Sequence, residues 1–521
     1  MKRFFPSLRH LLCLSFMSSS LFAQQKTDTA RFMVAAAHPL ATKAGMDIMA
    51  RGGNAFDAIT ASAFMLSVVE PTMSGLGGRL QTIYRKASGE TGGIDATTQV
   101  PASYKPTPKE EEDGFGAAGV PGMVKGIIEL HSKNGKLPLK TVMAPAIQTA
   151  QEGFIVLKDE ASRMASAIKE IRRFPSTAKH FLINDSSPIA GSRFQQPVLA
   201  KTLQRIAKDK GKSFYYGGEA RTLASEISKG GGYLTYNDIM AYTANPAKLL
   251  RGSYRGYEII GLGMPSYGAI VIEMLHLLEQ QPLDTCSEAV YLIHQANAHK
   301  KAYDDRKFLR KEEEKLIDKS FAASRWKDET TTSAASPEDA RNGHTTHLVA
   351  SDEDGNVVSL TQSLGPVMGS KITAPGGFLL ATSMGPYLSN MRAGERAASH
   401  IAPILVLKDG VPVLALGAAG GARIVPAVVQ VISRFIDRQL PLEKALAAAR
   451  VFQLEKSLQV ENHKEILWED LKTLQLLRQQ KVPVTEVRQT AQFGRVHAVQ
   501  RLPNGEWIGA ADPDWSGSAG Q

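Results

Sequence analysis

One short stretch carries the strongest structural signal: Thr345-Thr346-His347-Leu348-Val349-Ala350, then Asp354-Gly355-Asn356, then Val357 to Thr361. Two runs of β-branched and apolar residues flank a turn sequence, which predicts a β-hairpin. Immediately before it, Asp328 to His344 consists mostly of Thr, Ser, Ala, Glu, Asp and Asn, a composition typical of a flexible surface segment. The sequence therefore predicts a strand that starts abruptly at Thr345, directly after a polar segment.

A threonine at this position has two interpretations. Thr-Thr at the start of a strand is ordinary β-propensity, and the local pattern alone indicates nothing more. A threonine at a chain N-terminus, however, is a nucleophile with its own base, because its free α-amine has a pKa of about 8 and lies next to its hydroxyl. Cleavage between His344 and Thr345 would create such an N-terminus.

The segments around the hairpin mix helices and strands. Residues 39–69 have helical patterning interrupted at Gly52-Gly53, which predicts two packed helices. Residues 162–280 are predicted to be mostly helical, with a strand at Tyr257 to Gly261. We expect an α/β fold in which sheets lie between helices. Further strands are predicted at 82–85, 92–95, 378–381, 404–408 and 413–417, and further helices at 426–438 and 442–449.

The first residues have the order of a secretory signal. Residues 1–23 combine a basic start, a short apolar run at Leu11 to Met17, and small residues up to a cleavage point after Ala23. A short buried helix is the alternative, but it would not explain that order. Because Cys13 lies inside the signal, the mature chain keeps only Cys286 and forms no intramolecular disulfide. We therefore expect a secreted protein, located in the bacterial periplasm.

Composition and charge argue against several classes of function. The chain has 521 residues and a formal net charge of +10, but its basic residues are spread thinly. The one dense cluster, Lys307 to Lys319, includes Glu312 to Glu314, which indicates a solvated helix face rather than a nucleic-acid-binding patch. There is no run of about 18 apolar residues, so we expect no membrane span. Because no His, Cys or carboxylate ligand cluster stands out, we expect no metal and no organic cofactor.

A series of ordered motifs covers nearly the whole mature chain and resembles one known family. The motifs are His38-Pro39-Leu40-Ala41 with Arg51-Gly52-Gly53-Asn54-Ala55-Phe56-Asp57-Ala58; Val69-Glu70-Pro71 with Ser74-Gly75-Leu76-Gly77-Gly78; Gly119-Val120-Pro121-Gly122; Ala144-Pro145-Ala146-Ile147; Ser253-Tyr254-Arg255-Gly256-Tyr257; Thr345-Thr346-His347 with Asp354-Gly355-Asn356; Gly417 through Arg423; and Gly509-Ala510-Ala511-Asp512-Pro513. They are similar to those of the γ-glutamyltransferase (glutathione hydrolase) family of N-terminal-nucleophile hydrolases. The resemblance implies a four-layer αββα sandwich. It also implies autocleavage into a large subunit, 24–344, and a small subunit, 345–521, which stay together.

The resemblance also implies the catalytic residues. Thr345 matches the family's catalytic threonine, and His344–Thr345 is then the cleavage site. Ser363 stands where the family has a second threonine whose hydroxyl contacts the nucleophile, and a serine hydroxyl can donate and accept in the same way. Gly420 and Gly421 match the pair whose backbone N–H groups stabilise the tetrahedral oxyanion. A simple strand-to-helix turn at Gly420-Gly421 is compatible with the same geometry.

The positions that hold a γ-glutamyl headgroup in the family are altered. Thr97 stands where the family has an Arg for the α-carboxylate, and Gly365 replaces an Asn. Ser383 replaces an acid or amide, and Ser399-His400 replaces a pair of serines. Because loss of a desolvated Arg–carboxylate pair is costly, the site should bind γ-glutamyl donors poorly.

One residue offers a compensating contact. Arg79 follows the Gly77-Gly78 loop that is expected to line the pocket. Arg79, together with His400, predicts recognition of a different acyl group that carries a negative charge. The alternative is that Arg79 is a surface residue on a displaced loop. We therefore expect an amide hydrolase or acyltransferase that forms an acyl-enzyme on Thr345 and acts on a small amide or peptide. An acylase for non-glutamyl amides and a non-catalytic periplasmic binding relative are the alternatives.

Overall fold

The computed structural model describes residues 29–106, 113–328, 335, 343–384, 391–466, 468, 471–479 and 483–520. The predicted signal at 1–23 lies outside these residues, and so does most of the polar segment before His344. Within the described ranges, no helix is long and apolar enough to cross a membrane. Cys286 is a free, half-buried thiol.

The first of two large sheets contains the predicted hairpin at its centre. It has seven strands in the order β18-β1-β9-β10-β2-β3-β6, all paired antiparallel. The hairpin is confirmed as β9 and β10, although β9 begins one residue earlier than predicted, at His344. The strands are β1 (Met33–Ala36), β2 (Arg79–Arg85), β3 (Thr91–Ala96), β6 (Asn245–Pro246), β9 (His344–Ser351), β10 (Val357–Gly365) and β18 (Ser518–Ala519).

The second large sheet packs face to face with the first. Its six strands have the order β17-β16-β12-β11-β8-β7 and are also antiparallel. Apolar side chains from both sheets, among them Val349 and Leu405, form one buried cluster between them. The strands are β7 (Leu249–Tyr254), β8 (Tyr257–Leu262), β11 (Ile404–Lys408), β12 (Val411–Ala419), β16 (Arg495–Arg501) and β17 (Trp507–Ala511).

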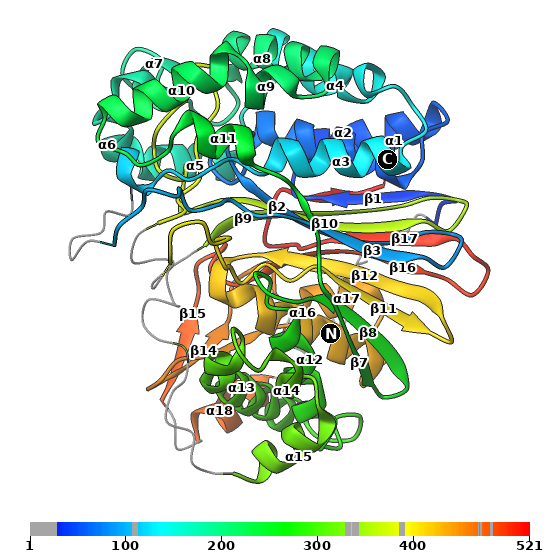
Figure 1. The fold of residues 1–521 in the computed structure, drawn as a ribbon. Coiled ribbons are helices and arrows are strands. Elements are labelled where there is room, and N and C mark those ends of the chain that lie inside the picture. The colour runs from blue at the N-terminus through cyan, green and yellow to red at the C-terminus, as the bar shows by residue number, and fades with distance from the viewer. Residues whose placement is uncertain are drawn as a thin grey trace, which may run out of the picture.

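Helices cover the outer face of each sheet (Figure 1). Leu348 and Leu360 belong to a buried cluster with residues of α1 and α2, whereas Val349 faces the other sheet, because successive side chains in a strand alternate between its two faces. On this side lie α1 (Pro39–Ala50), α2 (Ala55–Val69), α3 (Met123–Asn134), α4 (Leu139–Glu152), α5 (Lys158–Ser166), α6 (Ile168–Arg172), α7 (Pro175–Phe181), α8 (Pro197–Asp209), α9 (Lys212–Tyr216), α10 (Gly218–Lys229) and α11 (Tyr236–Ala241).

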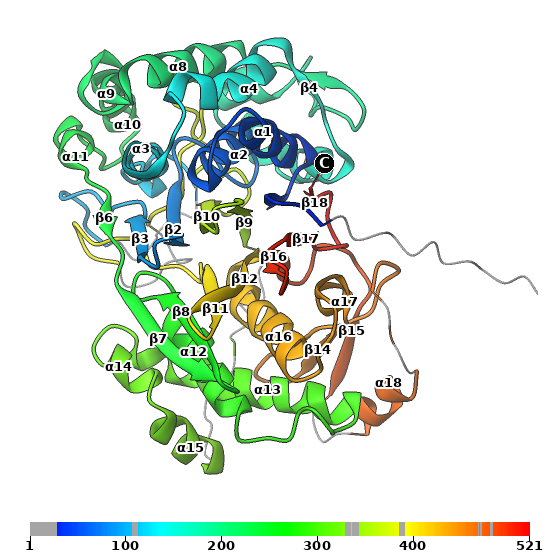
Figure 2. The ribbon, with the colours of Figure 1, turned by 90° about the vertical axis from the view of Figure 1, so that its right-hand side faces the viewer.

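The second helix layer lies on the opposite side of the pair of sheets, as Figure 2 shows from another direction. Ile404 and Leu416 join the buried cluster that contains α12 and α16. The helices are α12 (Gly268–Leu278), α13 (Glu288–Asp304), α14 (Glu313–Leu316), α15 (Lys319–Lys327), α16 (Ile424–Ile436), α17 (Leu442–Ala447) and α18 (Leu471–Arg478), with a small sheet of β13 (Val451–Gln453), β14 (Leu458–Glu461) and β15 (Val484–Val487) nearby.

Most predicted elements are confirmed, and a few are wrong. The helix pair around Gly52-Gly53 is present as α1 and α2, and Asn54 begins α2 with a reciprocal capping box. The predicted strand at 378–381 forms only isolated bridges, Leu380 with Gly77 and Leu379 with Thr373. Residues 307–319 do not form one helix, because short turns separate Asp305–Phe308, α14 and the start of α15.

Candidate active site

The predicted nucleophile lies in a row of side chains across the first sheet. Thr345 in β9 pairs with Ser363 in β10, and Ser363 pairs with Arg79 in β2. Directly opposed residues of an antiparallel sheet point to the same face. Gln362, which precedes Ser363 in β10, donates from Nε2 to the Ala63 carbonyl of α2. Because neighbouring side chains of a strand point to opposite faces, the row faces away from the helices and toward the second sheet. Thr345 and Ser363 are only 3% and 2% exposed.

Hydrogen bonds connect this row to the predicted cleavage site. The Thr345 hydroxyl donates to Ser363 Oγ at 3.1 Å, and the Ser363 hydroxyl donates to the His344 carbonyl oxygen at 2.8 Å. The Gly365 N–H also donates to Ser363 Oγ, at 2.9 Å. The β9–β10 ladder shifts its register between Ser363 and Gly365, and such an irregularity can re-aim a side chain. Ser363 thus contacts both the hydroxyl of Thr345 and the carbonyl of the bond before it.

The glycine pair faces the chain just before Thr345. Gly420 and Gly421 have φ angles of +140° and +60°, in the region that favours glycine, where β12 ends and a 3-10 turn leads into α16. A methyl group added to Gly343 would overlap the backbone N and Cα of Gly421. The backbone of residue 343 therefore packs directly on the pair. Both predictions for the pair, an oxyanion-binding turn and a strand-to-helix turn, are compatible with this position.

A buried carboxyl group contacts Thr346, the residue after the predicted nucleophile. Glu70, at the end of α2, accepts hydrogen bonds from Thr346 Oγ1 at 2.9 Å and from Trp515 Nε1 at 3.2 Å. Burial raises its pKa to about 7, although the Arg163 guanidinium, 3.6 Å away, opposes the shift. Glu70 belongs to one of the motifs in the sequence, but no role was predicted for it, because it lies 276 residues before Thr346 and no local pattern links the two.

Two arginines act on the imidazole of His344, at the predicted cleavage site. Burial, reinforced by the positive charges of Arg163 and Arg495, lowers the pKa of His344 well below its usual value. The same two arginines also contact the Trp515 ring, with guanidinium carbons 4.2 Å and 3.8 Å from its centre. His344 is therefore neutral at physiological pH.

Of the predicted acyl-binding residues, Arg79 belongs to the row itself. It is fully buried, so the alternative of a surface position is wrong. Its guanidinium donates to the Thr382 carbonyl, and a Cβ added at Gly365 would lie 3.7 Å from its Nη2. Thr97 follows β3 just beyond the last paired residue, Ala96, and its hydroxyl bonds to Asp95.

The remaining predicted residues, Ser383, Ser399 and His400, contact different parts of the structure. Ser383 packs against Gly119, and its buried hydroxyl has no hydrogen-bond partner within the described ranges. Ser399 donates its N–H to the Pro265 carbonyl at 3.0 Å. The His400 ring packs against Tyr267 and Tyr303, with centroids 4.5 Å and 6.2 Å away. Because the Tyr303 hydroxyl bonds to the Ala422 carbonyl, His400 lies on the glycine-pair side of the site.

The fold also gathers a set of metal-ligand side chains that the sequence did not suggest. Glu461, His463 and Asp514 place one potential ligand atom each within 4.8 Å of one another. The set was not predicted, because Asp514 is distant in the chain and the Glu-x-His pair alone is a weak signal.

Comparisons with known proteins place these observations in one family. Residues 41–521 match the sequence model of gamma-glutamyltranspeptidase. The acylase ACY 1 proenzyme of Pseudomonas sp. strain V22 is 32% identical over 92% of this chain and 92% of its own. The glutathione hydrolase proenzyme of Escherichia coli K12 is 30% identical over 92% of this chain and 90% of its own. The crystal structure of cephalosporin acylase from Bacillus halodurans superposes with a TM-score of 0.86, at 26% identity, over 97% of this chain and 99% of the other. The chain belongs to the γ-glutamyltranspeptidase family, whose relatives here are hydrolases and acylases with the same α/β fold of antiparallel sheets and helices.

Proposed function

We propose that this chain is a self-cleaving amide hydrolase or acyltransferase whose nucleophile is Thr345. One observation carries the proposal: the Ser363 hydroxyl bridges the Thr345 hydroxyl and the carbonyl oxygen of His344. This is the arrangement that an attack by Thr345 on the preceding peptide bond requires. The proenzyme names of the acylase and glutathione hydrolase relatives support a processed chain.

Self-cleavage follows from this geometry as an N-to-O acyl shift. Ser363 Oγ accepts the proton of Thr345 Oγ1 while its own hydroxyl donates to the His344 carbonyl oxygen, where negative charge develops. The new C–O bond forms as the His344–Thr345 C–N bond breaks, and the Thr345 nitrogen takes up the proton. Water then hydrolyses the ester. The products are a carboxylate at His344 and a free amine at Thr345.

The same groups then serve the reaction with an external amide. The α-amine of Thr345 accepts the hydroxyl proton and later gives it to the leaving amine. In the uncut chain, residue 343 packs on Gly421, so the segment before the cleavage site occupies the place of an acyl substrate. After cleavage, the N–H groups of Gly420 and Gly421 stabilise the oxyanion of the substrate. Water or an amine finally releases the acyl group.

The pocket favours an acid-tailed acyl group over a γ-glutamyl one. Arg79 is a buried cation two strands from Thr345 on the same face, which corresponds to about 10 Å between backbones. A short dicarboxylic acyl chain bound at Thr345 would place its free carboxylate within reach of this guanidinium. Thr97 and Gly365 provide neither the Arg nor the amide of a γ-glutamyl site. The function is therefore closer to that of the acylases.

Matched substrates and matched variants test this specificity. We expect glutaryl-4-nitroanilide to be hydrolysed faster than two matched substrates. γ-Glutamyl-4-nitroanilide adds an α-amine to the acyl chain, and pentanoyl-4-nitroanilide lacks the terminal carboxylate. Arg79→Met should lower kcat/KM for the glutaryl substrate by about 10²-fold, because a desolvated charge pair contributes roughly 2–5 kcal/mol. The control is Arg85→Met, at the half-buried far end of the same strand, which should leave kcat/KM for both substrates unchanged. Equal losses on glutaryl and pentanoyl substrates would refute a carboxylate contact.

Processing and location complete the proposal. Residues 24–344 form the large subunit and 345–521 the small one, together making the αββα sandwich of N-terminal-nucleophile hydrolases. The order of basic, apolar and small residues in 1–23 supports export. A non-catalytic binding relative would instead remain one uncut chain on a denaturing gel.

A further inference from the structure

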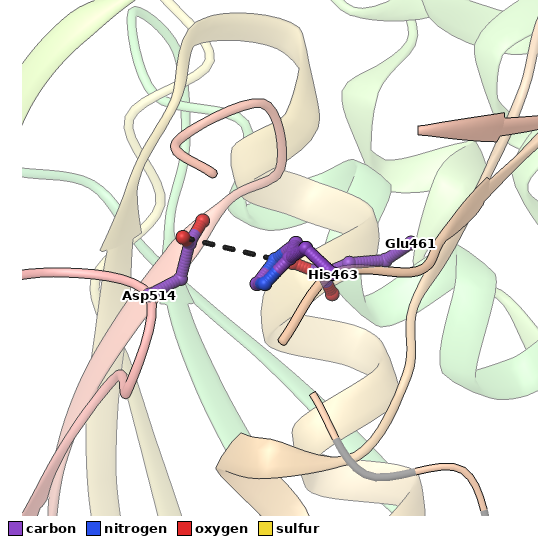
Figure 3. A group of neighbouring side chains, drawn as sticks. All are labelled: Glu461, His463 and Asp514. Carbon is purple, nitrogen blue, oxygen red and sulfur yellow. Dashed lines mark hydrogen bonds and ion pairs between the residues drawn. The ribbon is translucent and has the colours of Figure 1, made fainter. Parts of the chain in front are cut away.

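We propose that Glu461, His463 and Asp514 form a binding site for a divalent metal ion of the zinc type. Glu461 ends β14, His463 follows two residues later, and Asp514 lies in the loop after β17. Figure 3 shows the His463 ring beside both carboxyl groups, and one ligand atom from each residue lies within 4.8 Å of the others. None of the three residues takes part in the mechanism above.

Burial distinguishes this group from an ordinary acidic patch. Glu461, Asp514 and His463 are 0%, 5% and 8% exposed. Asp514 Oδ1, although buried, has no hydrogen-bond partner within the described ranges. It faces the imidazole, 3.7 Å from His463 Nε2, while its other oxygen accepts the Ala491 N–H at 2.6 Å. A buried carboxylate oxygen without a partner is costly, and a bound cation would satisfy it.

The distances fit a metal better than a shared proton. His463 Nε2 lies 3.1 Å from Glu461 Oε1 and 3.7 Å from Asp514 Oδ1. A proton on Nε2 can form a good hydrogen bond with only the nearer oxygen. Ligands held about 2.0–2.2 Å from a tetrahedral zinc ion are about 3.3–3.6 Å apart, so small shifts would bring both oxygens and Nε2 into one coordination sphere.

Surrounding groups orient the ligands and select the ion. The Arg450 guanidinium lies 3.6 Å from Glu461 Oε2 and donates to Asp512 Oδ2 at 2.6 Å, which fixes the outer side of the cluster. One imidazole and two carboxylates, with water as a fourth ligand, suit Zn²⁺. Ca²⁺ prefers six to eight oxygen ligands and Mg²⁺ a mostly hydrated octahedron, so both fit a small, buried, nitrogen-containing site poorly.

Such an ion would tie two distant parts of the small subunit together. Asp514 directly precedes Trp515, whose indole donates to Glu70, and Glu70 accepts a hydrogen bond from Thr346. The loop after β17 would then be anchored to the end of β14. We therefore assign the ion a structural role.

Metal content and spectroscopy of the full chain test the proposal. The protein is stripped with dipicolinate, dialysed against Zn²⁺ or Co²⁺, and freed of unbound ion; zinc is counted by mass spectrometry. We expect about one Zn²⁺ per chain, a higher unfolding temperature than for the stripped protein, and the intense visible absorption of tetrahedral Co²⁺. Asp514→Asn keeps the size and the Ala491 contact but removes the ligand charge, and should abolish all three. The control is Asp354→Asn, at an exposed ion pair with Lys136.

The results separate a metal site from a protonated ion pair. Stripped wild type that takes up less than about a tenth of an equivalent of Zn²⁺, and whose unfolding temperature zinc does not change, would overturn the proposal. Undiminished binding by a folded Asp514→Asn variant would also overturn it. If that variant does not fold, the Co²⁺ spectrum of the wild type decides: a tetrahedral spectrum supports the site, and the weak octahedral spectrum of hydrated Co²⁺ refutes it.

Discussion

Removal of the Ser363 hydroxyl is the perturbation that most directly affects the proposed self-cleavage. In the folded chain, Ser363 Oγ accepts from Thr345 Oγ1 at 3.1 Å and donates to the His344 carbonyl at 2.8 Å. Ser363→Ala removes both the proton acceptor and the donor to the developing oxyanion. Loss of one such donor raises a barrier by about 3–4 kcal/mol, so the cleavage rate should fall by about 10²–10³-fold. The Gly365 N–H also loses its acceptor, which costs about 1–3 kcal/mol of stability.

The assay follows cleavage of freshly refolded chain on denaturing gels over time. Ser363→Thr keeps a hydroxyl on the same carbon and should retain cleavage within about tenfold. Ser359→Ala is the matched control, because Ser359 lies on the same face of β10, is equally buried, and bonds to Leu416 O rather than to the cleavage site. Cleavage of Ser363→Ala within about threefold of the wild-type rate would refute the reasoning, since a lost donor cannot cost so little.

Two further predictions follow from other contacts at the site. Gly343→Ala should slow self-cleavage by at least about tenfold, because the added methyl overlaps the backbone of Gly421 and displaces the bond to be cut; Gly218→Ala, where a Cβ meets nothing within 4 Å, is the control on the same gels. The second concerns Glu70, whose pKa is raised from 4.5 to about 7 by burial despite Arg163. The folded chain holds this proton more tightly than the unfolded one, so up to about 3 kcal/mol of stability is present below pH 4.5 and lost as the pH rises through 7. Denaturant unfolding of wild type and Glu70→Gln from pH 4.5 to 8 should show this loss of stability only in the wild type. Unfolding free energies that change with pH in parallel for the two proteins would contradict the prediction.

The sequence predicted the elements whose signals are local. Alternation of apolar residues and the Asp354-Gly355-Asn356 turn define the β9–β10 hairpin, and Asn54 with Gly52-Gly53 defines the boundary between α1 and α2. Residues 378–381 have strand propensity, but they form only isolated bridges after a turn at residues 375–376. A strand needs a neighbouring strand to pair with as well as propensity. Propensity alone could not show that residues 378–381 have no continuous partner strand among the described residues.

The sequence predicted site residues that belong to recognisable motifs, but not the contacts that form only when distant segments pack together. The register of the β9–β10 hairpin places Ser363 opposite Thr345. The sequence indicated Ser363 only through the family resemblance. Glu70 meets Trp515, and Asp514 meets Glu461 and His463, only after the two sheets pack. These residues are too far apart in the sequence for a local pattern to link them. Burial of Arg79 also depends on packing, because its place at the start of β2 could equally have faced solvent.

The central claim is that Thr345 becomes an N-terminal nucleophile, and the intact mass of the smaller fragment tests it most directly. The fragment is measured before and after a brief incubation of the processed protein with glutaryl-4-nitroanilide. The account predicts a fragment that begins at Thr345 and gains one acyl group, located on Thr345 by fragmentation, with no cleavage or adduct in Thr345→Ala. A chain that stays uncut, a cut elsewhere, or an acyl group on another residue would contradict it.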